Sequence, residues 1–235
     1  MEWCNAGRLH MNKRLLNAGA LGMSLMVSGA AQAQPVVVEL FTSQGCSSCP
    51  PANASLAAIS NRPDVLALSF GVTYWDYLGW KDTFAKPEFT ERQVSYERGL
   101  GHSGPFTPQI VVNGSADTVG NEFSAVQQLV NASPLNGPPI SLVGQTVSIG
   151  AATHGTSADV WLVRYEPRTI NVPVARGENE GATLPHKNVV RELTRLGAWT
   201  GQAATYRISP AQAGLATAIL VQKPHGGAII AAFKG

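Results

Sequence analysis

The sequence predicts an α/β domain followed by an all-β, sandwich-like domain, and three observations carry this prediction. First, the apolar runs 35–41 and 65–72 have the β-branched content typical of buried central strands, and a helix-forming stretch lies between them. Second, the segment 134–139 is rich in proline and glycine, as linkers between domains are. Third, short strand patterns separated by turn residues fill residues 140–235.

Residues 1–33 have the pattern of a secretory signal peptide. Lys13 and Arg14 give a short basic start, an apolar stretch follows, and Ala31-Gln32-Ala33 is a small-x-small cleavage signal. The alternative is a membrane anchor, but the apolar stretch is shorter than the roughly 20 strongly apolar residues that span a bilayer. We therefore expect a periplasmic or secreted protein without stable membrane insertion after cleavage.

Composition and charge exclude several classes of protein. The chain has 235 residues, 44% of them hydrophobic and 14% charged, which suits compact globular domains rather than a disordered chain. Loss of residues 1–33 removes three of the 17 Lys and Arg residues and one of the 15 Asp and Glu residues, which leaves 14 of each. A neutral chain without a basic run is not expected to bind nucleic acid.

Residues 34–133 form the expected α/β domain. Pro50 and Pro51 suit the first turn of a helix that continues to residue 60, because the donors they lack would be unsatisfied there anyway. The segment 106–114 reads as a strand that ends in an Asn-Gly turn, and Asn121 is placed to cap an amphipathic helix after it.

An insertion at 73–104 separates the second strand from the third. It contains a helical stretch from about residue 88 to residue 100. Its first part concentrates four aromatic residues, Tyr74, Trp75, Tyr77 and Trp80. Such aromatics usually pack as core, which is the first interpretation. The second interpretation is a wall or lid beside the cysteines of the preceding loop.

The second half of the chain carries the sandwich pattern. One irregular stretch, 176–201, interrupts it, and we expect a short helix at 188–196 there. Arg176-Gly177-Glu178-Asn179 opens this stretch, and we interpret it as salt bridges and caps that pin a long loop rather than as a ligand site. The expected strands are 140–149, 159–165, 170–175, 205–209, 216–222 and 228–233.

The chemistry of the chain is expected at Cys46-Ser47-Ser48-Cys49. This pair follows a buried strand and opens a helix, so the amide donors of the helix N-terminus favour a thiolate on Cys46. Cys46 is then the attacking sulfur and Cys49 resolves the mixed disulfide. The alternative is a purely structural disulfide, although so short a loop removes little entropy from the unfolded chain.

Thr107-Pro108 is the second element of the expected site, at the start of a strand. A cis peptide bond before Pro108 would turn the backbone of Thr107 toward the disulfide, since cis bonds are nearly always a proline feature. A trans proline on an edge strand is the alternative.

The motifs ELFTSQGCSSCPPA, YWDYLGW, FTPQIVVNG and RGEN together resemble a secreted family, domain of unknown function 1223, and residues 36–132 resemble the thioredoxin superfamily. The resemblance implies an α/β thioredoxin-like fold for the first domain. It also implies that Cys46 is the nucleophile, that Cys49 is the resolving thiol and that Pro108 is the cis-proline beside them. The sequence departs from thioredoxin in its Ser-Ser dipeptide, in the insertion and in lacking Trp before Cys46.

These features predict an exported protein that resembles thiol-disulfide oxidoreductases, with enzymatic activity left open. Its expected partners are protein or small-molecule thiols and disulfides, and no cofactor is expected. The alternative is a non-catalytic binding protein, or a copper or zinc carrier that uses the two thiols and His102 of the Gly-His-Ser-Gly loop.

Overall fold

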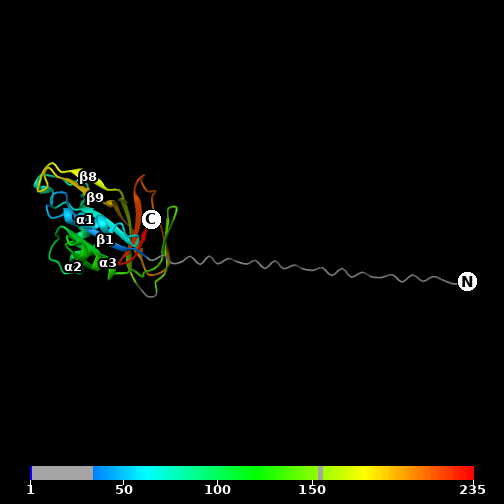
Figure 1. Ribbon diagram of the computed structural model, residues 1–235. Helices are drawn as coiled ribbons and strands as arrows, with labels where there is room; N and C mark the ends of the chain where they lie inside the picture. Colours follow the sequence, from blue (N-terminus) through cyan, green and yellow to red (C-terminus); the bar gives the residue numbers. More distant parts are fainter. Residues whose placement is uncertain (2–33, 153–155) are drawn as a thin grey trace. The chain divides into compact units, whose positions relative to one another are not determined.

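The computed structural model describes residue 1 and residues 34–152 and 156–235 (Figure 1). The expected signal peptide therefore falls outside the described residues, apart from Met1. Within the described part, no helix has the length and apolar character needed to cross a membrane.

Thirteen strands and three α-helices make up the described residues, with one short 3-10 turn, η1 (Asp76–Leu78). The helices are α1 (Pro50–Ile59), α2 (Pro87–Leu100) and α3 (Phe123–Asn131). The strands are β1 (Val36–Thr42), β2 (Val65–Gly71), β3 (Gln109–Val112), β4 (Ala116–Thr118), β5 (Ile140–Val143), β6 (Thr146–Ile149), β7 (Ala158–Glu166), β8 (Ile170–Pro173), β9 (Thr183–His186), β10 (Val189–Trp199), β11 (Ala204–Arg207), β12 (Ala216–Gln222) and β13 (Ile229–Lys234).

A mixed sheet of eight strands, in the order β13-β12-β7-β10-β2-β1-β3-β4, organises the protein. β1 runs parallel to β2 and antiparallel to β3, and β10 joins the outer edge of β2 in parallel. Strands from both sides of segment 134–139 thus belong to one sheet. Two smaller sheets, β11-β6-β5 and β8-β9, complete the β-structure of the described residues.

The expected fold class, an α/β thioredoxin-like domain followed by a β-sandwich, is wrong. The protein is mostly β, and the strands expected to form a separate sandwich instead extend the sheet that β1 and β2 begin. The junction is at Asn188, whose carbonyl accepts from Ser69 N at 2.9 Å and whose Nδ2 donates to Ala67 O at 2.8 Å. These contacts fill the free edge of β2, which an isolated first domain would leave unpaired.

The expected short helix at 188–196 is also wrong, because this segment is strand β10. It pairs antiparallel with β7 along nearly its whole length, with two register shifts. Its charged and leucine-containing sequence suits a helix, but pairing with β7 overrides that weak local preference. One such cross-strand contact is the ion pair between Arg195 and Asp159 at 2.6 Å.

The main helices and strands expected in the first half form, but the expected helix cap does not. The apolar runs form β1 and β2, the two prolines open α1, and α2 and α3 form where helices are expected. α3 begins after Glu122, and no side-chain cap from Asn121 is formed. β1 alternates between the faces of the sheet: Val36 and Val38 pack with α1 and α3, whereas Val37 and Phe41 pack with α2.

Candidate functional site

Cys46 and Cys49 form a disulfide directly after β1, with their Cα atoms 5.5 Å apart. Cys49 is the residue that caps α1, so the pair sits at the N-terminal end of the helix. Pro50 and Pro51 have no N–H, so the Ala52 amide is the first backbone donor of the helix itself. Both cysteines are 0% exposed, whereas the two serines between them are exposed. The serines therefore meet solvent while the sulfur atoms are covered by other parts of the chain.

The loop that carries the disulfide is held by its own backbone. Cys46 N donates to Ser43 O at 3.2 Å, and Gly45 N donates to Ser43 Oγ at 3.1 Å. Cys49 N donates to Cys46 O at 3.2 Å, which closes the turn into α1. Ser48 Oγ lies 3.3 Å from Cys46 Sγ, close enough to donate to a thiolate on that atom.

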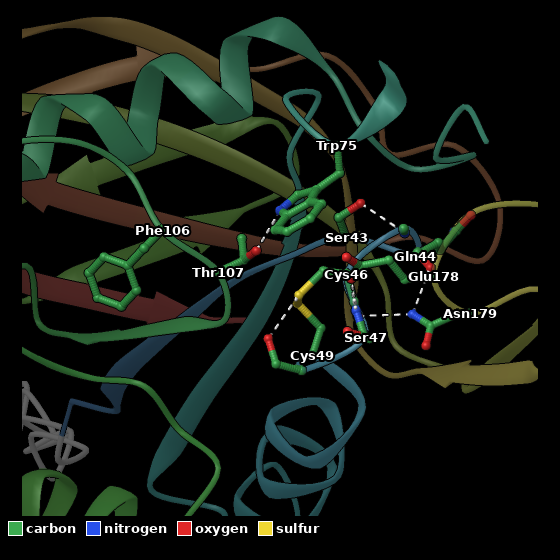
Figure 2. The surroundings of a disulfide bond; sticks show 12 residues. Ser43, Gln44, Cys46, Ser47, Cys49, Trp75, Phe106, Thr107, Glu178 and Asn179 are labelled. Atoms are coloured by element: carbon green, nitrogen blue, oxygen red, sulfur yellow. Dashed lines mark hydrogen bonds between the residues drawn. A yellow bond between two sulfur atoms is a disulfide. The ribbon is translucent and has the colours of Figure 1, made fainter. Parts of the chain in front are cut away.

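Trp75 of the aromatic insertion covers one side of this loop. Its Nε1 donates to Thr107 Oγ1 at 2.6 Å, and Figure 2 shows the indole ring and Thr107 next to the disulfide. A Cβ at Gly45 would lie 3.4 Å from Trp75 Cβ, so the two backbones approach closely here. Trp75 also packs against the core cluster on the α2 face. It thus serves as core and as a wall beside the cysteines, the two roles considered for the insertion.

The other aromatics of the insertion behave differently. Trp80 Nε1 donates to Gln44 Oε1 at 2.9 Å, so this side chain supports the loop from the side of Gln44. Tyr77 is 78% exposed and contributes nothing to the cover. Tyr74 is half-buried, and its hydroxyl donates to Gln93 Oε1 at 3.1 Å.

The Thr107–Pro108 peptide bond is cis, as the family resemblance implies. Gln93 of α2 holds the chain on both sides of this bond, since Gln93 Nε2 donates to Phe106 O at 2.7 Å and to Gln109 Oε1 at 2.9 Å. Of the predicted site residues, Cys46 and Cys49 form the disulfide and Thr107 lies beside it. Pro108 directly follows Thr107.

His102 does not reach the cysteines. Its Nε2 lies 2.7 Å from Asp117 Oδ2, and its ring packs edge-on against Phe106 with the centroids 5.1 Å apart. The grouping of two cysteines with His102, on which the metal-carrier alternative depended, is not formed. Among residues 34–152 and 156–235, no three His, Cys, Asp or Glu side chains are grouped as metal ligands would be.

Two residues of the Arg-Gly-Glu-Asn segment hold the cysteine loop from the second half of the chain. Asn179 Nδ2 donates to Gln44 O and to Cys46 O, each at 2.9 Å. Glu178 Oε2 accepts from Ser47 N at 2.9 Å (Figure 2). The Ser47 amide, and then its hydroxyl, hold the pKa of the Glu178 carboxyl below its usual range. The expected salt bridges of this segment are not among the ion pairs of the described residues. Instead, Glu178 and Asn179 hold the loop that carries the cysteines through hydrogen bonds.

Asp82 is a site residue that the sequence analysis missed. Its carboxylate accepts from Gln44 N at 2.7 Å and from Phe84 N at 2.7 Å, which fixes the insertion to the cysteine loop. Burial raises the pKa of Asp82, and the amide donors act against that shift. The clustering of Asp76, Lys81 and Asp82 among the aromatics was the available signal, since charged groups in an apolar segment usually have a partner.

Most of the chain matches one known protein family. The family described as protein of unknown function, DUF1223, matches residues 37–222. The chain belongs to this family. The DUF1223 chain is also similar to the crystal structure of protein AGR_C_4864 from Agrobacterium tumefaciens, at 35% identity and a TM-score of 0.70 over 87% of this chain and 95% of that one. No curated protein matches this DUF1223 chain.

A second solved structure, HBP35 of Porphyromonas gingivalis, shares the fold. It has a TM-score of 0.58 at 14% identity, and the match covers 86% of this DUF1223 chain and 75% of that one. At this identity the similarity concerns the arrangement of the backbone alone.

Proposed function

We propose that this DUF1223 protein is an exported thiol-disulfide exchange protein that acts through Cys46 and Cys49. The observation that carries the proposal is a disulfide at the start of α1 around which four separate segments converge: the turn 43–45, Trp75, Thr107 and the pair Glu178-Asn179. A structural cross-link of so short a loop would stabilise the chain little, and it would not need such surroundings.

The exchange balances as two displacements. A substrate thiolate attacks Cys46 Sγ, the Cys46–Cys49 bond breaks, and Cys49 leaves as a thiolate that takes up a proton. A second substrate thiolate then attacks the substrate sulfur of the mixed disulfide, and Cys46 leaves as a thiolate. Two thiols have become one disulfide, and the protein holds two electrons as a dithiol. The reverse sequence reduces a substrate disulfide.

The roles of the two sulfurs follow the resemblance to the thioredoxin superfamily and are supported by local chemistry. The dipole of α1 and the Ser48 hydroxyl, 3.3 Å from Cys46 Sγ, stabilise negative charge on Cys46. Thr107 precedes the cis-proline and lies beside the disulfide, where its backbone can pair with an extended substrate.

Access to the sulfur atoms requires a local movement, because both cysteines are 0% exposed. Trp75 and Thr107 are only half-buried and meet through one hydrogen bond, so rotation of the indole opens the site at the cost of that bond and some packing. Narrow access of this kind favours small thiols or one extended peptide segment over the surface of a folded protein.

The test is trapping of the mixed disulfide. The mature chain with Cys49→Ala keeps the attacking sulfur but cannot resolve, so it should accumulate a disulfide with glutathione or with a substrate cysteine, measured by mass spectrometry. The matched control is Cys46→Ser, which should trap far less through the remaining Cys49. Absence of any mixed disulfide in Cys49→Ala, together with no disulfide reductase or oxidase activity in the wild type, would refute the proposal.

A further inference from the structure

Glu178 is a carboxylate that the fold holds against the cysteine loop from outside it. The residue lies between β8 and β9, and Gly177 before it has φ +84°, a conformation that residues with a side chain rarely adopt. Asn179 then bonds to the carbonyls of Gln44 and Cys46 at 2.9 Å each. The backbone on both sides of Glu178 is therefore constrained, and its carboxylate is aimed at the Ser47 amide.

This carboxylate accepts the hydrogen bond of the backbone amide that follows the reactive cysteine. Ser47 N belongs to the residue that follows Cys46, and it donates to Glu178 Oε2 at 2.9 Å. When the disulfide is reduced, negative charge develops on Cys46, the residue next to an amide that already binds an ionised carboxylate. Nearby like charges disfavour the thiolate, and the amide that could have compensated them is already bonded.

We infer that Glu178 lowers the reduction potential of the Cys46–Cys49 pair by destabilising the reduced form with the Cys46 thiolate. The inference rests on the proposed exchange reaction and deepens it. A lower potential poises the dithiol to give electrons to a substrate disulfide rather than to take them from substrate thiols. Glu178 acts through the loop and not on the substrate, so it is a positioning residue.

Other charged groups near the loop are the same in the wild type and in a Glu178 variant. Asp82 binds Gln44 N at 2.7 Å, and Asp76 Oδ1 accepts from Asp82 N at 3.1 Å. Arg176 lies on the segment of Glu178 itself, with its Cδ 3.9 Å from the position of a Cβ at Gly79. α1 carries no charged residue, and His186 on the adjoining β9 has a pKa of about 4 because it is buried, so it is neutral at neutral pH.

The experiment replaces the charge and keeps the hydrogen bond. In Glu178→Gln, the amide Oε1 still accepts from Ser47 N, so the geometry of the loop is retained. The disulfide is equilibrated with reduced and oxidised glutathione at about pH 8, where a Cys thiol ionises. We expect the equilibrium to move about threefold to tenfold toward the dithiol, a potential about 15 to 30 mV higher, since tenfold corresponds to about 29.6 mV.

The pH profile separates charge from structure. At about pH 5 a smaller fraction of Cys46 is thiolate than at about pH 8, so the difference between the two proteins should shrink. In reduced proteins that carry Cys49→Ala, adding Glu178→Gln should speed the alkylation of Cys46 near neutral pH. A loosened loop would instead shift the equilibrium equally at both pH values, and that result would overturn the inference.

Glu180→Gln is the matched control. Glu180 is an exposed carboxylate two residues further on, so the change in net charge is identical, and we expect the potential to stay at the wild-type value. Equal shifts in the two variants, or none in Glu178→Gln, overturn the inference and leave the exchange reaction standing. A wild-type disulfide that never exchanges with glutathione overturns the proposed function and this inference with it.

Discussion

Two buried centres lie in β1 and directly after it, and they differ in whether the groups that cover them can move aside. The first is Glu39, inside the strand on the α2 face, bonded to Arg92 and Tyr96. The second is the disulfide just after the strand, covered by Trp75 and Thr107. Burial alone therefore does not mark a reactive site: what matters is whether the groups that cover it are themselves buried.

The partners of Glu39 are themselves buried. Arg92 Nε lies 2.7 Å from Glu39 Oε1, Arg92 donates to Tyr96 OH at 2.9 Å, and Gln222 Nε2 donates to the same hydroxyl at 3.1 Å. All four residues are buried. Burial and the neighbouring carboxylate raise the pKa of Tyr96 well above its usual value, so it donates as a neutral phenol. Such a satisfied network contributes to stability, and the Glu39 side chain at its centre is 0% exposed.

The largest effect is expected from breaking this buried network. Arg92→Met removes the cation and leaves the Glu39 carboxylate buried with only its tyrosine partner, which should lower the free energy of unfolding by about 3 to 5 kcal/mol. Urea unfolding measures the loss. The double variant Glu39→Gln with Arg92→Met, as control, should recover part of it. The comparison fails if stability barely changes while reduction of the disulfide accelerates.

Burial of His186 should make the stability of the protein depend on pH. It is buried against Phe84, its Nε2 has no partner among the described residues, and burial lowers its pKa from 6.5 to about 4. The unfolded chain binds a proton on His186 more tightly than the folded chain does. The free energy of unfolding is therefore highest above about pH 6.5, and it falls by up to about 3 kcal/mol as the pH falls toward about 4.

Unfolding free energies measured across that interval test this effect. His186→Leu should remove this part of the pH dependence, because the side chain no longer titrates. A wild-type curve with the same slope as His186→Leu would show that burial of this imidazole does not contribute to acid sensitivity.

Opening the disulfide centre should change reactivity more than stability. Trp75→Ala removes the half-buried cover, so the native disulfide should be reduced about tenfold faster by a bulky thiol, with a smaller gain for a small thiol. Trp80→Ala is the matched control, since Trp80 supports Gln44 rather than covering the sulfur atoms. Equal acceleration by both thiols, in step with a large drop in melting temperature, would indicate that Trp75 is only core.

Local features were predictable from the sequence because their determinants are adjacent in the chain. The strand before Cys46, the prolines that open α1 and the Thr107-Pro108 pair lie within short motifs. The pairing of β10 with β2 was not predictable from the sequence. Asn188 and Ala67, which meet there, are 121 positions apart, and neither segment shows a pairing preference. The change of composition at 134–139 marks where the chain passes from α3 to β5, and it carries no information on this long-range pairing.

The site was predictable in the same partial way. Cys46 and Cys49 define it, but Glu178 and Asn179 reach it across 131 and 133 positions. Their hydrogen-bonding chemistry identified them as residues that pin a loop, and only the fold identifies which loop. His102 shows the converse, because closeness in sequence to Pro108 suggested the cysteines while Asp117 is its partner in space.

The smallest effect is expected at the hydrogen bond that closes the cover. Thr107→Val keeps the shape of the side chain and removes the acceptor for Trp75 Nε1, at 2.6 Å in the wild type. A lost hydrogen bond of this kind costs about 1 kcal/mol, which corresponds to roughly fivefold more of the open form. Reduction of the native disulfide by a bulky thiol should accelerate by about that factor. Thr107→Ser retains the hydroxyl and should react like the wild type. If Thr107→Val also reacts like the wild type, packing of the indole alone keeps the site closed, and the contrast between the two centres rests on Trp75 without Thr107.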